Sequence, residues 1–530
     1  MKVFLLYRDR DFDSNCPLPP HSATLMKDLE IDRLLGAMAA GDAFLFDVAK
    51  KTLFASLSQT EDILYRQQVL RECLEHAAVI RDIYAIAVEA IEQEKKVWGA
   101  IFGRYPDSSL SRSIDVLRIF IGSLERLRVI ADQSDEEFHS EGLKRFFEMI
   151  TRELNDAYLD TVKSYLQRLT FKRGVLLSAE LGKGNKLSQF VLLKPQDEKR
   201  GWRELLKRWM EQLSSKGTQE SFVYQVADRD EAGMRALTEL KGRGISNVAT
   251  ALAQSTDHIL SFFTKLRMEL GFYVGCLNLR DRLINKKETF CFPEPTSSDE
   301  QVFSARALYD VSLSLSIEDR AVGSDVDADE KSLILITGAN RGGKSTFLRS
   351  VGLSQLMMQC GMFVAAQRFS ANIRDGLYTH FKREEDSTLK SGKLDEELHR
   401  MSVIVDSITP HSLMLLNESF GSTNEREGSE IARQIVRSFL DSGVKVFYVT
   451  HMFDLAGGFY QEKMVNSLFL RAERLEDSTR TFRLIEGAPL PTSYGEDLYW
   501  RIFCHGPLQG NESLLGGDVG QRTRKAGMRK

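Results

Sequence analysis

The sequence lacks the patterns that would place the chain in a membrane or cross-link it through metal ions or disulfide bonds. No apolar stretch reaches the roughly 18 residues that a membrane-spanning helix needs, and the apolar start at residues 1–7 is too short for a signal peptide. The six cysteines lie far apart without a C-x-x-C pair, which argues against a zinc ribbon or a disulfide framework. We interpret them as free thiols in a reducing compartment and expect a cytoplasmic protein without membrane association.

The chain also lacks an excess of positive charge. It contains 71 Lys and Arg residues and 75 Asp and Glu residues, which gives a formal net charge of −4. Any nucleic-acid partner would therefore have to be held by a local basic patch. The hydrophobic content of 42% and the charged content of 28% are ordinary for a globular protein. A length of 530 residues is enough for roughly three to four domains.

Helix-breaking residues are scarce in the first part of the chain. Residues 25–170 show apolar positions at helical spacing, interrupted at Pro106 by a predicted loop between long helices. Strand patterns on either side of Gly182-Lys183-Gly184-Asn185 predict a β-hairpin. Helical patterning returns at residues 202–214 and 230–283. We therefore expect an N-terminal segment at residues 1–29 and a mostly α-helical core or lever domain, with a small hairpin insertion, at residues 30–290.

The second part of the chain alternates strands with helices. Residues 284–301 contain two prolines and a polar cluster, which favours a domain boundary. Beyond it, we predict strands at residues 311–317, 333–336, 413–416 and 444–449, and a solvated acidic loop at residues 323–330. This order indicates a largely parallel, doubly wound α/β domain at residues 291–505. Residues 506–530 are rich in glycine and basic, and we expect a disordered tail.

A phosphate-binding (Walker A) loop follows the predicted strand at residues 333–336. Residues 338–345 fit G-x-x-x-x-G-K-[ST], and a predicted helix follows at residues 346–358. In such a loop the backbone N–H groups surround phosphates, Lys344 places a charge on them, and Ser345 offers a hydroxyl to Mg²⁺. A plain surface turn is the alternative, but the strand before and the helix after argue against it. The predicted ATP-binding residues are Gly338, Ala339, Asn340, Arg341, Gly342, Gly343, Lys344, Ser345 and Thr346.

Two later strand ends carry the residues expected to act on the phosphates. Most such sites place Asp-Glu after a buried strand, where the Asp holds the metal shell and the Glu polarises the attacking water. Here the pair is Asn417-Glu418, so Glu418 is the candidate base, and Asn417 replaces the Walker B Asp. Asn417 can contact the metal only through water and without charge, so we expect slow hydrolysis. His451 ends the next strand as a candidate γ-phosphate sensor; a purely structural histidine is the alternative.

These motifs together resemble the MutS family. The resemblance is carried by residues 337–349, Asn417-Glu418 and residues 448–455. It implies a P-loop NTPase domain of ABC type that uses ATP and Mg²⁺, binds DNA and forms a homodimer through its ATPase domains. Ser391 is similar in position to the family serine that reaches the nucleotide of the partner subunit, with residues 387–388 as a competing match. The sequence departs from the family pattern at Ala339, Arg341 and Asn417.

The residues before Glu30 are too few for the mismatch-reading and connector domains of that family, so we expect contacts to the DNA backbone rather than to mismatched bases. The expected role is DNA mismatch repair or a related repair or recombination process. Two alternatives stay open: a nucleotide-gated dimeric scaffold with little hydrolysis, and an ABC- or SMC-like ATPase that does not act on DNA. Candidate phosphate contacts at the hairpin, which are equally consistent with an ordinary solvated face, are Lys172, Arg173, Lys183, Lys186 and Lys194.

Overall fold

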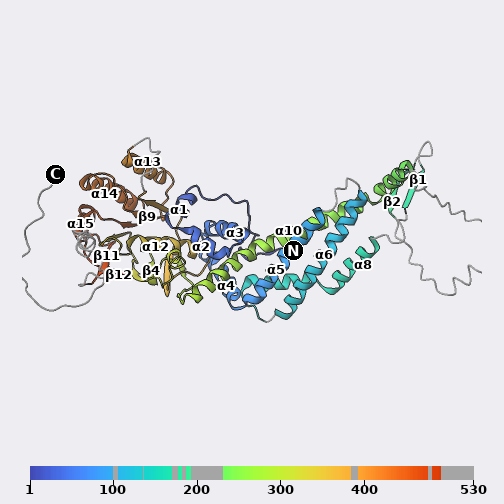
Figure 1. Cartoon of the computed structure of the whole chain (residues 1–530), viewed down its shortest axis with the longest axis horizontal. Helices are drawn as coiled ribbons and strands as arrows, with labels where there is room; N and C mark the ends of the chain where they lie inside the picture. The colour runs from blue at the N-terminus through green and yellow to red at the C-terminus, as the bar shows by residue number, and fades with distance from the viewer. Residues whose placement is uncertain are drawn as a thin grey trace, which may run out of the picture.

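The computed structural model describes residues 1–99, 106–134, 137–169, 177–181, 187–192, 231–383, 392–475 and 480–490. The molecule is elongated, as Figure 1 shows. An α/β part lies at one end, and long helices extend from it to a two-stranded hairpin at the other end. None of the described helices combines the length and the apolar character needed to cross a lipid bilayer.

The helical part is organised around one very long helix, α10 (Glu231–Asn285). Its 55 residues span about 80 Å at the rise of an α-helix. Helix α10 packs against the other long helices, α5 and α6, and against α2 and α3 near the α/β part. In the described part of the chain, the helices that precede it are α1 (Ser22–Asp28), α2 (Ile31–Ala39), α3 (Ala43–Phe54), α4 (Thr60–Glu75), α5 (Ala77–Gly99), α6 (Pro106–Ser134), α7 (Glu141–Glu153) and α8 (Asp156–Leu169). The prediction of a long helical region is therefore confirmed.

The predicted hairpin strands are also present. Strands β1 (Leu177–Leu181) and β2 (Leu187–Leu192) pair antiparallel. Several other predictions lie outside the described residues: the turn of this hairpin, the helix at residues 202–214 and the tail at residues 506–530.

The first residues of the chain belong to the helical core. The carboxylate of Glu269 in α10 accepts backbone hydrogen bonds from Leu5 at 2.6 Å, Leu6 at 3.1 Å and Phe12 at 2.8 Å. The side chains of these three residues are buried in the main apolar cluster. Burial raises the pKa of Glu269 to about 7, although the three N–H donors favour the charged form. Residues near the start of the chain are thus fixed to its longest helix.

A six-stranded sheet forms the centre of the α/β part, in the order β12-β11-β6-β10-β9-β8. All neighbouring strands are parallel except the β11–β12 pair. Helix α12 (Lys344–Gln359) covers one face, whereas α13 (Lys393–Val405), α14 (Glu425–Asp441) and α15 (Phe453–Gln461) cover the other. The strands are β6 (Leu333–Thr337), β8 (Leu377–Phe381), β9 (Leu413–Asn417), β10 (Lys445–Val449), β11 (Ser467–Arg474) and β12 (Arg480–Glu486). The predicted strands at residues 333–336, 413–416 and 444–449 are confirmed.

Two predictions for the segment at residues 311–330 are wrong. Residues 311–317 were expected to form a strand, but the chain forms the short helix α11 (Val311–Ser314), because the Asp310 carboxylate caps it by accepting from the Leu313 backbone N–H at 3.0 Å. The acidic stretch at residues 323–330 contains a strand, β5 (Ser324–Asp327), whose alternate side chains are buried. The second sheet has the order β3-β7-β4-β5, with β3 (Glu294–Thr296), β4 (Phe303–Leu308) and β7 (Arg368–Asn372).

Candidate nucleotide-binding site

The glycine-rich loop joins the fully buried strand β6 to the start of α12. Gly338 has φ of 109° and Gly343 has φ of 91°, a left-handed backbone conformation that L side chains rarely adopt. A Cβ added at Gly338 would lie 2.9 Å from the backbone nitrogen of Ala472, and one at Gly343 would lie 2.8 Å from the carbonyl oxygen of Phe482. The backbones of β11 and β12 therefore lie so close to the loop that glycine is required at both positions.

Lys344 is folded back into this loop. Its ammonium donates hydrogen bonds to the carbonyl oxygens of Gly338 at 2.9 Å and Ala339 at 3.0 Å, and only 5% of the residue is exposed. Burial lowers the pKa of Lys344, while the Glu418 carboxylate acts in the opposite direction. A phosphate group in the loop would compete with the two carbonyls for the same ammonium hydrogens. The N-terminus of α12 adds partial positive charge at the same place.

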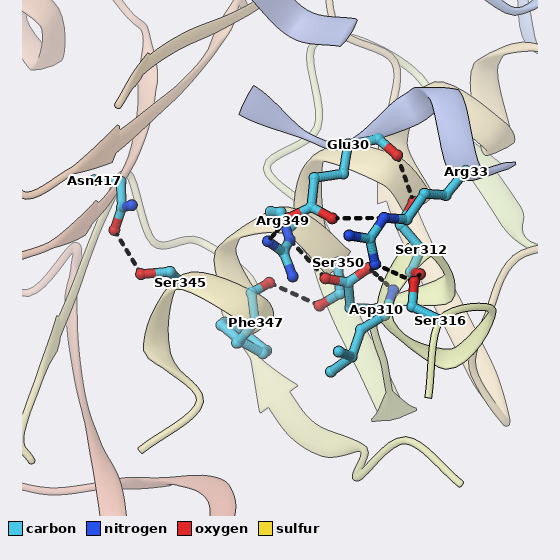
Figure 2. A network of polar contacts seen from close by, with 11 residues as sticks. Glu30, Arg33, Asp310, Ser312, Ser316, Ser345, Phe347, Arg349, Ser350 and Asn417 are labelled. Atoms are coloured by element: carbon cyan, nitrogen blue, oxygen red, sulfur yellow. Dashed lines mark hydrogen bonds and ion pairs between the residues drawn. The ribbon is translucent and has the colours of Figure 1, made fainter. Parts of the chain in front are cut away.

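Ser345 and Asn417, the two residues predicted to lie on the metal side, meet in the structure. The Ser345 hydroxyl donates a 2.9 Å hydrogen bond to the Asn417 amide oxygen, as Figure 2 shows. Both groups are neutral oxygen donors, and Mg²⁺ binds oxygen ligands while keeping several waters. They fit an ion whose charge is balanced mainly by nucleotide phosphates and which Ser345 and Asn417 would help to hold. Such a pair offers the ion less charge than a serine and a carboxylate would.

Glu418 and His451 lie together at the same edge of the sheet. The Glu418 backbone N–H donates to the carbonyl of Val449 at 2.8 Å, and its φ of 52° turns the chain away from the strand direction. His451 Nδ1 lies 3.9 Å from Glu418 Oε2, and the two side chains are 39% and 31% exposed. Both groups are accessible to water. This arrangement can place a proton acceptor and an imidazole beside phosphates bound in the loop.

One polar cluster next to Glu418 was missed by the sequence reasoning. His380, at the end of β8, lies 2.7 Å from the Ser419 hydroxyl through Nδ1 and 3.1 Å from the Glu397 carbonyl oxygen through Nε2. Burial lowers the pKa of His380 to about 4, so the ring is neutral. In the neutral ring, Nε2–H can donate to the Glu397 carbonyl oxygen. The single proton of the Ser419 hydroxyl is then shared between Nδ1 and the His380 carbonyl oxygen, each 2.7 Å from the hydroxyl oxygen. No sequence signal marks this residue, because its role depends on the position of β8 beside β9.

Other predicted functional residues lie outside the described residues. They include Ser391 and its competing match at residues 387–388, and the basic residues proposed to contact DNA. Helix α13 begins at Lys393, shortly after Ser391, and it supplies the Glu397 contact to His380.

Comparison with known proteins gives two matches to family models. Residues 58–286 match the MutS2 N-terminal domain, and residues 334–499 match MutS domain V. The chain belongs to the MutS family. The domain V match includes the glycine-rich loop, Asn417, Glu418 and His451. The match to the MutS2 N-terminal domain covers most of the helical part.

Individual relatives within the MutS family match parts of the chain. The DNA mismatch repair protein MutS of Thermotoga neapolitana is 34% identical over 177 residues, which are 33% of this chain and 22% of that protein. The endonuclease MutS2 of Thermus thermophilus is 31% identical over 170 residues, 32% of this chain and 23% of its own length. The MutS protein of Leptospira interrogans is 26% identical over 263 residues, 46% of this chain and 31% of its own. The matched part thus spans less than a third of each of these relatives.

Proposed function

We propose that this MutS-family chain is an ATPase that couples ATP binding and slow hydrolysis to DNA binding, in DNA mismatch repair or a related repair process. The observation that carries the proposal is the meeting of Lys344, the Ser345–Asn417 pair and Glu418 at one edge of the central sheet. The names of the relatives support the repair role. We further propose a cytoplasmic protein.

Each residue of the site has a distinct task in this proposal. The loop N–H groups and Lys344 bind the phosphates, and Ser345 with Asn417 orients the hydrated metal ion. Mg²⁺, when bound, would neutralise phosphate charge in the transition state. Glu418 accepts a proton from the attacking water, and His451 holds that water or the outer phosphate. The neutral His380 fixes the backbone after Glu418 through Ser419, so that the base keeps its position.

The DNA and dimer parts of the proposal rest on the family and on the shape of the molecule. The long helices carry the β1–β2 hairpin far from the ATPase part, which suits a pair of arms that enclose a duplex (Figure 1). Contacts there would go to the DNA backbone through basic residues and would weaken steeply with salt. We propose that two copies pair through their ATPase domains, with Ser391 reaching the nucleotide of the second copy.

One observation favours a second candidate, a nucleotide-gated scaffold with little hydrolysis. Asn417 accepts a hydrogen bond from Ser345 but brings no charge to the metal side. ATP occupancy alone would then set the conformation. Turnover separates the two candidates, because the scaffold would bind ATP while releasing almost no phosphate.

The test combines nucleotide binding, turnover and DNA binding on the full chain. We expect saturable ATP binding, slow phosphate release, and duplex binding whose affinity falls steeply between low and physiological salt. Matched and single-mismatch duplexes, otherwise identical, distinguish mismatch recognition from backbone binding. Light scattering with ATP and Mg²⁺ on wild type and Ser391→Ala tests the dimer. Absence of ATP binding would contradict the proposal as a whole, whereas ATP binding without any duplex binding would leave only an ATPase that does not act on DNA.

A further inference from the structure

Helix α12 is fastened along one side to residues from the first part of the chain. The helix begins at the glycine-rich loop with Lys344 and Ser345 and runs for 16 residues, about 24 Å. Positions 345, 349, 352 and 359 are spaced by four, three and seven residues, which places them on one face of the helix. The first of these positions belongs to the nucleotide site, and each of the other three contacts a residue that lies before position 60 in the chain.

The contact nearest the nucleotide site is an ion-pair network at Arg349, one turn after Ser345. The Arg349 guanidinium bonds the Glu30 carboxylate through one nitrogen and the Asp310 carboxylate through Nε at 2.7 Å. Figure 2 shows Arg349 between these two acids, with Ser345 on the turn before it. The Arg349 side chain is 17% exposed and that of Asp310 is 0% exposed, so the pair is only weakly screened by water. Arg349 therefore has a fixed orientation.

Glu30 links Arg349 to the helical part of the protein. It immediately precedes α2 (Ile31–Ala39), and its backbone carbonyl accepts a 3.0 Å hydrogen bond from the Ser312 hydroxyl. Its carboxylate also pairs with Arg33 of α2, with 3.0 Å between Nε and Oε2. Helix α2 in turn packs on α10, the helix that extends to the far hairpin. A path of direct contacts thus leads from Arg349 to the longest helix of the protein.

The rest of α12 is held in the same way. A Cβ at Gly352 would lie 2.9 Å from the Leu29 side chain, so that side chain occupies the space beside the glycine. At the C-terminal end, Leu57 N–H donates to the Gln359 carbonyl at 2.8 Å, and the buried Arg66 donates to the Cys360 carbonyl at 3.1 Å. With these attachments α12 cannot shift without moving α2 or breaking buried contacts.

We propose that Arg349 and Glu30 are positioning residues that couple the first turn of α12 to helix α2. Through them, nucleotide binding at the loop would change the position or the local stability of α2 in the helical part. The proposal rests on ATP binding at the loop. Bound phosphates would compete with the Gly338 and Ala339 carbonyls for the Lys344 ammonium, and the metal ion would compete with Asn417 for Ser345. Nucleotide binding would thus replace the hydrogen bonds that hold the first turn of α12. The Arg349–Glu30 pair lies one turn after Ser345, at the point where that change would reach the segment before α2.

Hydrogen exchange of the full chain, with and without ATP and Mg²⁺, tests the coupling. In wild type we expect ATP to slow exchange at residues 338–346 and to change exchange at residues 31–39 by about threefold or more. In Arg349→Gln and Glu30→Gln the response at the loop should persist and the response at residues 31–39 should disappear. Arg437→Gln is the matched control, because it removes an arginine ion pair with Glu462 from α14, outside the path between Arg349 and α2; it should behave as wild type.

The outcomes separate this inference from the proposed function. No ATP response at residues 338–346 in wild type would refute nucleotide binding at the loop, and the coupling with it. A loop response without any response at residues 31–39 would refute the coupling alone. A response at residues 31–39 that survives in both Arg349→Gln and Glu30→Gln, or is lost equally in Arg437→Gln, would also overturn it. Exchange without nucleotide reports any general loss of stability in each variant.

Discussion

The hydroxyl of Ser345 donates a 2.9 Å hydrogen bond to the side-chain amide oxygen of Asn417, which joins the first turn of α12 to the end of β9. Asparagine and aspartate have nearly the same shape, so the contact would survive a change to the carboxylate. What the amide lacks is negative charge. The pair therefore allows the effect of charge at this position to be measured with little change in geometry.

Asn417→Asp should strengthen Mg²⁺-dependent ATP binding. A charge placed a few ångströms from the ion, partly screened by water, contributes about 1 kcal/mol to the free energy of Mg²⁺ binding. This lowers the Mg²⁺ concentration needed for half-maximal ATP binding roughly fivefold. Turnover should rise with it. Binding of a fluorescent ATP analogue over a Mg²⁺ titration measures the Mg²⁺ concentration for half-maximal binding. Asn155→Asp, which adds the same charge at an exposed helix N-cap far from the loop, should leave the titration unchanged. An unchanged Mg²⁺ requirement in Asn417→Asp would remove Asn417 from the metal side.

Lys344→Ala should weaken ATP binding by at least about a hundredfold, because the ammonium is the buried cation within the loop and charge-assisted bonds to phosphate are strong. Equilibrium binding of labelled ATP measures the loss. The control is Lys331→Ala, at the other end of the same strand, whose ammonium bonds the Val465 carbonyl. Equal affinities for the two variants would show that the phosphates bind elsewhere.

Glu418→Gln should bind ATP normally and hydrolyse it about a hundredfold or more slowly, because the amide keeps the shape of the side chain but cannot accept a proton. Single-turnover phosphate release measures this step apart from binding. Glu462→Gln, an exposed carboxylate paired with Arg437, provides the comparison. Wild-type phosphate release from the Glu418 variant would mean that another group is the base.

His380 should make the protein sensitive to acid. Its pKa is about 4 in the folded chain and ordinarily 6.5, so the unfolded chain takes up the proton first as the pH falls. The stabilising contribution is present above pH 6.5 and is lost as the pH falls toward 4. Between pH 7 and pH 5 the loss is about 2 kcal/mol in the free energy of unfolding.

Urea unfolding at the two pH values tests this prediction. His380→Gln should remove that part of the pH dependence, whereas His139→Gln, at a solvent-exposed histidine, should retain it. An identical pH dependence in wild type and His380→Gln would show that the pKa of His380 does not differ between the folded and the unfolded chain.

The elements that the sequence predicted correctly are those whose signal is local. The long helices follow from apolar residues at helical spacing, and the strands before residues 338, 417 and 450 follow from short apolar runs next to polar residues. The loop was recognised because glycines and Lys344 occur at fixed spacing. The prediction failed at residues 311–317, where alternation of serine with apolar residues resembled a half-buried strand. The chain forms a helix there instead, because Asp310 caps it and the hydroxyls of Ser312 and Ser314 donate hydrogen bonds to residues distant in the sequence.

The sequence by itself determined which residues are available for phosphate chemistry: the loop, Asn417-Glu418 and His451. The tertiary structure decided how they meet. Strand β10 lies between β6 and β9, so the Ser345–Asn417 contact depends on the strand order of the sheet, which no local pattern encodes. The Arg349–Glu30 pair joins residues 319 positions apart, and His380 is placed by the neighbour of its strand. Periodicity and motif spacing report interactions within a few turns or strands, whereas these contacts arise only when distant segments bury their apolar faces together.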